Sequence, residues 1–496
     1  MARTSPALPR ERLVPLIVAT AMFMENLDST VLATSLPAIA QDLGENPIHL
    51  KLAVTSYLLA LAIFIPASGW VADRLGARLV FRAAIAVFAA GSIGCGFAHD
   101  MTGLIAGRVV QGIGGAMMVP VGRLVVLRSI DRSDLVNALA WLTLPGMLGP
   151  ILGPPLGGFI TAYFHWRWIF WVNIPIAVLG IVLVTLFIPD VRGDERTRFD
   201  ALGFALVGPG LATFLTGATV AGLGLLPTAQ VAVLIGVGAV LLAAYGVHAL
   251  RTEAPIIDLR MFKLASMRAS IAAAFPFRIA VGATPFLLPL MLQVAFGLNP
   301  FQSGLTTFMA SIGALLMKAC ASPILRRWGF RRALTVNAVL AAVFIAVPGL
   351  FTPGWPWPVV MGLLLIGGFL RSLQFTALNA VAYAQVPDNR LSRATTLSAV
   401  VQELSGSVGV SVAALGLELM GRLDGTGPLE ASHFPPVFAA MGCLAAATSV
   451  LLYTMLPNDL GQDLVRRRTG PRTPPAAEPS SQSASGSARN TLKSQP

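Results

Sequence analysis

The feature that most constrains this chain is a series of long apolar stretches, each about 20 residues or more in length. A helix of that length crosses the hydrocarbon core of a bilayer, and a helix is required because lipid cannot hydrogen-bond to an open backbone. The sequence therefore predicts an all-α integral membrane protein with about 14 transmembrane helices. The expected spans are 12–36, 49–72, 78–98, 101–127, 136–161, 166–188, 199–221, 228–250, 267–296, 301–325, 333–352, 357–386, 393–420 and 435–456.

Composition excludes a soluble globular protein. Of the 496 residues, 55% are hydrophobic and 12% are charged, and the mean hydropathy is +0.73. Soluble domains carry about 25% charged residues. The first span is longer than the apolar region of a signal peptide and contains Glu25 and Asp28, so we expect it to be retained.

The basic residues are distributed unevenly between alternate loops. The net charge of +12 arises from 35 Lys and Arg residues against 23 Asp and Glu residues. If the N-terminus is cytoplasmic, 27 of the 35 basic residues lie in cytoplasmic segments, and the external loops hold only Lys51, Arg167 and Arg422. This is the positive-inside pattern. It predicts cytoplasmic termini and contacts with membrane lipid, and it argues against nucleic acid as a partner.

An internal repeat relates the first six spans to the last six. GWVADRLGARLV (69–80) follows the second span, and SPILRRWGFRRAL (322–334) follows the tenth. The fourth and twelfth spans share a similar pattern in GRVVQG (107–112) and FLRSLQF (369–375). The alignment pairs Arg74 with Arg327, Gly76 with Gly329, Arg78 with Arg331, Arg108 with Arg371, and Gln111 with Gln374.

This repeat predicts the domain organisation. We expect a six-helix bundle at 1–190, two linker transmembrane helices at 191–262, and a second six-helix bundle at 263–458. Residues 459–496 are rich in Pro, Ser and Arg and predict a disordered cytoplasmic tail. Duplicated bundles around a central cavity are typical of secondary transporters.

Five ordered motifs resemble those of the major facilitator superfamily, and within it the fourteen-spanning drug/proton antiporter family. They are LDSTVLATSLPAIA (27–40), GWVADRLGARLV (69–80), GRVVQGIGGAMMVP (107–120), GMLGPILGPPLGG (146–158) and WRWIFWVNIPI (166–176). The resemblance extends to about residue 457, and GGAMMVPVGRL, ASGWVAD and VPDN (386–389) bring it closest to one group of multidrug transporters. The resemblance implies a proton-driven exporter of the bacterial inner membrane that acts as a monomer without a cofactor.

The loop after the second span is a candidate gate. Gly69 allows close approach of two helices, and Asp73 at a helix end can bond backbone amides or an arginine across the bundle interface. In the resembled family this loop latches the cytoplasmic side, which implies that role for Gly69, Asp73, Arg74, Gly76 and Arg78. The alternative is a basic inner loop that only obeys topology.

The fifth span is a candidate hinge. Gly149, Gly153 and Gly157 recur every four residues, so a partner helix can approach at backbone distance. Prolines in the same span, including Pro150 and Pro154, remove backbone hydrogen bonds and bend the helix. In the resembled family this motif accompanies exporters.

Carboxylates within the spans are candidate proton carriers. Glu25 and Asp28 are three residues apart and share one helical face, which we expect to face a cavity. A carboxylate withdrawn from water can be protonated near neutral pH. Asp28 matches the acid of the family's LDxT motif, and Glu403 in span 13 is a candidate second site for a proton or substrate. The alternative for the span 1 acids is a salt bridge to Arg108.

The remaining polar residues of the spans divide between coupling and substrate binding. Arg108 is a candidate coupling residue, and an ion-pair strut is the equal alternative. The predicted substrate-lining residues are Gln111, Trp141, Arg278, Arg371, Gln374 and Asn379.

The sequence predicts a transporter and no enzyme. It has no Walker loop, and none of its five histidines is spaced to share a metal, so neither a cofactor nor a metal is expected. The leading interpretation is a proton-coupled antiporter for amphipathic, cationic drugs. The alternative is export of an anionic metabolite, such as an organic acid or a metal–carboxylate complex, which Arg108, Arg278 and Arg371 would suit. A channel is disfavoured by the repeat and the latch loops.

Overall fold

The computed structural model is helical throughout its described part, residues 10–130, 134–189, 199–221, 224–387, 390–425 and 429–456. Within these ranges, 13 helices are long and apolar enough to cross a membrane. A further helix, α5 (Leu135–Tyr163), has 29 residues and packs along the first helix. The predicted all-α membrane fold is therefore confirmed. The predicted tail at 459–496 lies outside the described residues.

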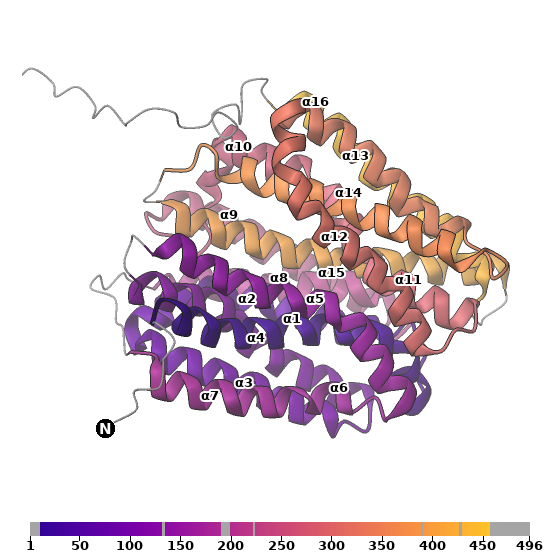
Figure 1. Ribbon diagram of the computed structural model, residues 1–496, viewed down its shortest axis with the longest axis horizontal. Helices are drawn as coiled ribbons and strands as arrows, with labels where there is room; N and C mark the ends of the chain where they lie inside the picture. Colours follow the sequence, from indigo (N-terminus) through magenta and orange to yellow (C-terminus); the bar gives the residue numbers. More distant parts are fainter. Residues whose placement is uncertain are drawn as a thin grey trace, which may run out of the picture.

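The first helices of the chain pack on one another and form the lower part of Figure 1. The helix α1 packs along α5, α3 along α4, and α2 against α4, while α7 covers α3 and α1. We call this group, together with α6, the N-half. Besides α5, it comprises α1 (Arg10–Leu43), α2 (Lys51–Leu75), α3 (Ala77–Gly96), α4 (Met101–Ser129), α6 (Trp168–Trp171) and α7 (Asn173–Phe187).

The last helices form the upper part of Figure 1 and pack in a related way. The helix α12 packs along α14, α13 along α16, and α11 against α15 and α16. We call this group the C-half. It comprises α10 (Ala265–Arg268), α11 (Phe275–Leu290), α12 (Pro300–Trp328), α13 (Phe330–Ala346), α14 (Trp357–Tyr383), α15 (Leu391–Asp424) and α16 (Phe434–Met455).

Two helices lie between the halves in sequence, as expected for an insertion. These are α8 (Ala201–Val220) and α9 (Thr228–Arg251), which pack on each other. The helix α8 also contacts α2 of the N-half and α15 of the C-half. The hydroxyl of Thr219 on α8 lies 2.9 Å from that of Ser411 on α15. The inserted pair therefore packs against both halves at one flank.

The long helices run between two ends of the molecule. We call the end where α1 begins and α16 ends the terminus side, which is at the left of Figure 1, and the other end the opposite side. The halves meet through α5 with α12, α2 with α15, and α1 with α11. The α5–α12 contact is intimate, since the hydroxyl of Ser311 donates to the carbonyl of Pro150 at 3.1 Å.

The glycines of α5 place it at backbone distance from α1, as their spacing predicts. A Cβ added to Gly149 would lie 2.8 Å from the backbone nitrogen of Leu27, and one added to Gly157 would lie 2.6 Å from the carbonyl oxygen of Val31. At Gly153 an added Cβ would overlap Thr30. A larger side chain on this face would push α5 away from the helix that carries Glu25 and Asp28.

The repeat is also visible in how α1 and α11 end. Both helices contain Leu-Pro, at 36–37 and 288–289, and both are followed by a glycine and then Asn-Pro. The two glycines, Gly44 and Gly297, have the same positive φ of 67°. The second copy is one residue longer, and a π-helical segment, Met291–Ala295, absorbs it.

Candidate functional site

A buried ion pair lies at the centre of the N-half. Arg108 on α4 donates through Nη1 to Oδ2 of Asp28 on α1 at 2.5 Å, and these residues are 1% and 3% exposed. Arg108 also donates to Oε1 of Gln111 at 2.9 Å and to the carbonyl of Ala53 at 3.2 Å. Its guanidinium carbon lies 4.1 Å from the ring centroid of Tyr57 on α2. The carboxylate of Asp28 thus neutralises the arginine, and groups on α1, α2 and α4 hold it in place.

The second oxygen of Asp28 is occupied as well. Oδ1 accepts from Nδ2 of Asn173 on α7 at 2.8 Å and from Nε2 of Gln111 at 3.0 Å. The hydroxyl of Ser92 on α3 accepts from the same Gln111 nitrogen at 2.7 Å. The network therefore joins five helices, and Asp28 has no free oxygen in this arrangement. Asp28 and Arg108 thus form the salt bridge that was the alternative to a coupling role. A coupling role for either residue remains a prediction.

Glu25 lies toward α4 like Asp28, but its carboxylate is not paired. Its Oε2 atom is buried and has no hydrogen-bond partner among the described residues, and the same holds for the hydroxyl of Tyr57. The two side chains meet beside Gly115, where an added Cβ would lie 3.2 Å from the Tyr57 hydroxyl and 3.8 Å from Cγ of Glu25. The side chains of Glu25, Tyr57 and Leu61 thus pack closely around Gly115.

Glu403 on α15 brings a second acid to the same region from the other half. Its charge acts on Glu25, as do those of Asp28 and Arg123. Both Glu25 and Glu403 are half-buried, and neither forms an ion pair in the described part of the chain. These two proton-coupling candidates are 378 positions apart in sequence and come from different halves, and the helix of Glu403 packs against α2, which carries Tyr57.

The C-half carries a partial copy of the buried network. Gln374 on α14, the repeat partner of Gln111, accepts from Nδ2 of Asn337 on α13 at 2.8 Å and donates to the carbonyl of Leu334 at 3.2 Å. Arg371, the partner of Arg108, donates through Nε to its own helix at Gly367. Sequence analysis missed Asn337, although a polar side chain in an apolar span was the available signal.

Other predicted substrate residues are spread over the molecule. The guanidinium carbon of Arg12 lies 5.7 Å from the ring centroid of Trp141 on α5, near the terminus side. Asn379 on α14 is exposed, and Arg278 on α11 is buried. The substrate-lining set therefore does not form one cluster in this arrangement, and its role stays a prediction.

The candidate latch loop makes its contacts within the N-half. Asp73 pairs with Arg128 of α4 at 2.7 Å, and Arg78 donates to the carbonyl of Thr185 on α7. Gly76 has a positive φ of 92°, which lets the chain turn between α2 and α3. The guanidinium of Arg74 lies 5.5 Å from the ring centroid of Trp70 on its own helix.

The expected close helix contact at Gly69 is wrong for this structure. A Cβ added there would meet no atom within 4 Å, because this face of α2 is exposed. Gly69 therefore does not bring a second helix closer to α2 in this arrangement. The latch role of the loop, which depends on contacts with the C-half, remains a prediction.

The halves are in contact at the opposite side. Gln293, in the π-helical segment after α11, donates to the carbonyl of Thr34 on α1 at 2.8 Å. A Cβ added to Gly158 on α5 would lie 3.0 Å from Cα of Phe301 and would overlap the carbonyl of Pro300 on α12. The halves are therefore in backbone-to-backbone contact at this point.

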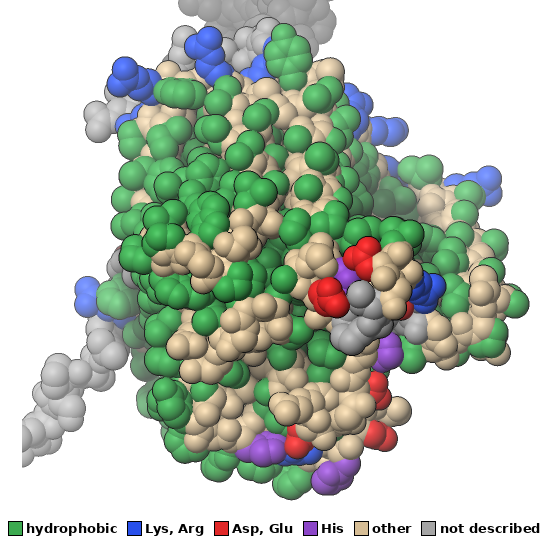
Figure 2. Space-filling model, turned by 90° about the vertical axis from the view of Figure 1, so that its right-hand side faces the viewer, with side chains coloured by type: hydrophobic (Ala, Val, Ile, Leu, Met, Phe, Trp, Pro, Cys, Tyr) green, Lys and Arg blue, Asp and Glu red, His purple; other side chains and the backbone are tan. Residues whose placement is uncertain are grey.

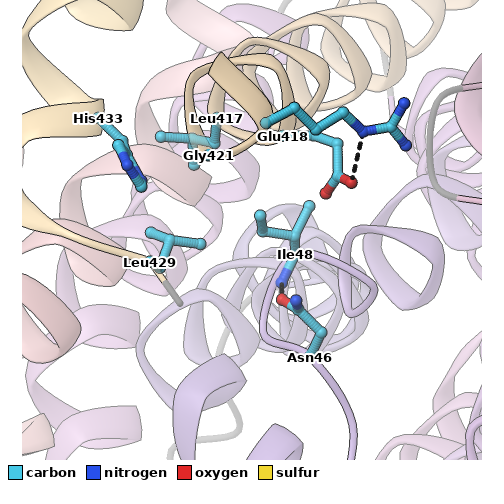
Figure 3. Close-up of a pocket in the computed structure, with 8 residues that line it drawn as sticks. Asn46, Ile48, Leu417, Glu418, Gly421, Leu429 and His433 are labelled. Carbon is cyan, nitrogen blue, oxygen red and sulfur yellow. Dashed lines mark hydrogen bonds and ion pairs between the residues drawn. The ribbon is translucent and has the colours of Figure 1, made fainter. Parts of the chain in front are cut away.

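The end face at the opposite side carries acidic and imidazole groups, which gather over one part of it (Figure 2). A small pocket of about 100 Å³ opens there between the two halves, and Figure 3 shows its lining. Glu418 on α15 pairs with Arg422 at 3.3 Å beside this pocket. The charge of Glu418 also acts on Lys51, whose ammonium is buried without a hydrogen-bond partner among the described residues. The pocket is lined by Asn46, Ile48, Leu417, Glu418, Gly421, Arg422, Leu429 and His433.

Enlarging Gly158 should separate the two halves at the opposite side. In Gly158→Ala the new methyl overlaps the Pro300 carbonyl, and overpacking of this kind costs about 1–3 kcal/mol. A cysteine at the buried Thr34 position, in protein lacking the three native cysteines, should then react about tenfold faster with a hydrophilic maleimide. Gly236→Ala on α9 is the control, because a Cβ there meets nothing within 4 Å. Equal labelling rates in the two variants would contradict the assigned contact.

Comparison with known proteins identifies relatives over most of the chain. The sequence profile of the Major Facilitator Superfamily matches residues 18–252 and 270–496. The protein named "Putative multidrug resistance protein MdtD" from Serratia proteamaculans is 41% identical over 405 residues, which cover 80% of this chain and 83% of the relative. Its namesake from Klebsiella pneumoniae is 36% identical and covers 91% and 96% of the two chains. These matches confirm the resemblance carried by the five motifs.

Solved structures of transporters share the fold. A D-xylose-proton symporter matches with a TM-score of 0.67 at 13% identity, over 91% of this chain and 99% of the symporter. The human organic anion transporter MFSD10 matches with a TM-score of 0.61 at 17% identity, over 90% and 100% of the two chains. At these identities the likeness concerns the arrangement of helices alone.

Proposed function

Because the chain belongs to the Major Facilitator Superfamily and is a multi-pass membrane transporter rather than an enzyme, we propose that it is a proton-coupled exporter of amphipathic, cationic molecules. The names of its relatives associate them with multidrug resistance, which supports a broad class of drug-like substrates. The proposed location is the bacterial inner membrane, with the terminus side in the cytoplasm, as the positive-inside pattern predicts. The proposed unit is the monomer.

The observation that carries this proposal is the unpaired carboxylate of Glu25. An ionised acid without a partner is costly to bury, so it stays neutral by holding a proton or becomes charged when water or a cation reaches it. Asp28 does not offer this choice here, because both of its oxygens are occupied. The hydroxyl of Tyr57, which also has no hydrogen-bond partner among the described residues, lies near Gly115 as Glu25 does and offers a polar contact beside the acid.

Proton and substrate then compete at one place. When the site opens to the outside, Glu25 takes a proton, which weakens its hold on a cation. When it opens to the cytoplasm, the acid releases the proton and the carboxylate attracts a cationic substrate. Glu403 would be a second acid of the same cycle, contributed by the other half.

Alternating access would rest on the contacts between the halves. The close contact of α5 with α12 at Gly158 joins the halves at the opposite side. In the proposed cycle this contact separates, α5 bends at its Gly-Pro motif, and the loop that carries Asp73 exchanges its Arg128 partner for contacts with the C-half. The rigid N-half network around Asp28 would move as a unit.

Transport by the purified protein tests the proposal. Reconstituted into vesicles with an imposed proton gradient, the full chain should accumulate ethidium, a permanent cation, and each addition of ethidium should accelerate collapse of the gradient. Protein-free vesicles and a membrane-permeant proton carrier are the controls. A protein that moves ethidium at the same rate with and without the gradient would contradict proton coupling.

A further inference from the structure

Arg278 on α11 is a buried cation without a counter-charge. The residue is 4% exposed, and its Nε and Nη1 atoms have no hydrogen-bond partner among the described residues. Burying an unpaired guanidinium is expensive, because neither water nor a carboxylate compensates its charge. Such a group persists where a ligand supplies the missing acceptors.

The surroundings of Arg278 suit an aromatic or amphipathic anion. Its guanidinium carbon lies 5.5 Å from the ring centroid of Phe375 on α14. The ring of Phe277, the preceding residue, lies 5.7 Å from the same ring. The side chain is therefore bordered by aromatic surface, and its planar fork of donors matches carboxylate, sulfonate and phosphate groups.

Further positive charge lies on the helices next to this point. Arg371 is one helical turn before Phe375 on α14, and its only hydrogen bond among the described residues is to the backbone of that helix. Lys318 on α12 donates to the hydroxyl of Thr376, the residue after Phe375, at 3.1 Å. None of these three cations forms an ion pair in the described part of the chain.

The two halves differ in this respect. In the N-half, the space between α1 and α4 holds Arg108 together with its carboxylate partner Asp28. In the C-half, the helices α11 and α14 contribute Arg278 and Arg371 without such a partner among the described residues. The repeat has therefore kept the cation and lost the acid that would neutralise it.

We propose that Arg278, assisted by the charge of Arg371, binds the anionic group of an amphipathic ligand. The proposal rests on the proposed function and adds zwitterionic molecules to its substrate class, with the acidic group bound by Arg278 and the basic group near Glu25. A membrane lipid headgroup offers the same chemistry, and the vesicle composition in the test separates the two sources.

The test uses the full chain in vesicles with 8-anilinonaphthalene-1-sulfonate as the probe. Its sulfonate stays ionised at every working pH, so a proton gradient does not change its charge. We expect saturable binding to the protein, and a loss of affinity of about tenfold or more in Arg278→Gln, because a charge-assisted hydrogen bond is removed. Arg278→Lys should retain part of the affinity, whereas Arg332→Gln, which changes an exposed cation of the same half, should bind like the unaltered protein.

The remaining outcomes show whether the anion belongs to a transported molecule or to a lipid headgroup. They also separate the test of Arg278 from the test of the proposed function. If binding is equal in phosphatidylcholine vesicles and in vesicles that also contain phosphatidylglycerol, and the probe is transported, the transported molecule supplies the anion. If phosphatidylglycerol displaces the probe and no transport of it occurs, the site belongs to a lipid headgroup. Unchanged affinity of Arg278→Gln in both vesicle types overturns the proposal. Gradient-driven ethidium transport by the unaltered protein in the same vesicles reports separately on the proposed function.

Discussion

Replacing Glu25 with Gln is expected to abolish gradient-driven extrusion of ethidium while leaving the protein folded. Gln has nearly the same shape but cannot bind and release a proton, and loss of a positioned proton-transfer group lowers rates by about a hundredfold or more. The variant also removes a buried carboxylate oxygen that has no hydrogen-bond partner among the described residues. We therefore expect the Tm in detergent to be unchanged or higher. Initial rates in vesicles, with and without the gradient, measure the effect.

The matched control is Glu45→Gln, a change of the same chemistry just beyond the end of α1. Glu45 is partly exposed, and the only side-chain partner it has among the described residues is His49 at 3.3 Å, so both transport and Tm should stay close to those of the unaltered protein. If Glu25→Gln still extrudes ethidium in response to the gradient at every pH, Glu25 is not the proton carrier.

The membrane spans were predictable from sequence because their cause is local. Each apolar stretch fills the bilayer by itself, so its length and composition suffice, and every expected span has a helix in the structure. The spacing of Gly149, Gly153 and Gly157 was equally informative, since a row of small residues leaves only a backbone surface. The extra residue absorbed by the π-helical segment Met291–Ala295 was harder to anticipate, because one inserted residue barely changes the apolar pattern.

The polar sites were less predictable because they depend on which helices become neighbours. Sequence placed Glu25 and Asp28 on one face, and both do lie toward α4, but only packing makes one acid paired and the other unpaired. The participation of Ser92 and Tyr57 could not be read from their own helices, where isolated polar residues are common. The expected close helix contact at Gly69 is absent for the same reason, since a small residue indicates such a contact only if a partner helix lies there.

Replacing Asp28 with Asn should destabilise the protein, in contrast to the change at Glu25. The substitution leaves the guanidinium of Arg108, which is 1% exposed, without its carboxylate, and breaking a buried pair in this way costs about 3–5 kcal/mol. The single oxygen of the new amide cannot accept from Arg108 and from the amides of Gln111 and Asn173 at once, so at least one of these donors loses its acceptor. We expect a large drop in Tm and in the yield of folded protein, measured by thermal unfolding in detergent.

A double-mutant cycle separates the pair from its surroundings. Arg108→Gln alone leaves a buried carboxylate without its cation and should be about as harmful, whereas the combination with Asp28→Asn removes both charges and should recover part of the loss, by up to about 3 kcal/mol. Arg332→Gln, at an exposed arginine, should change Tm little. Additive losses in the double variant would mean that the two charges do not support each other. The N-half would then lack the internal strut that lets it move as one body, and the division of labour between a structural Asp28 and a proton-carrying Glu25 would have to be abandoned.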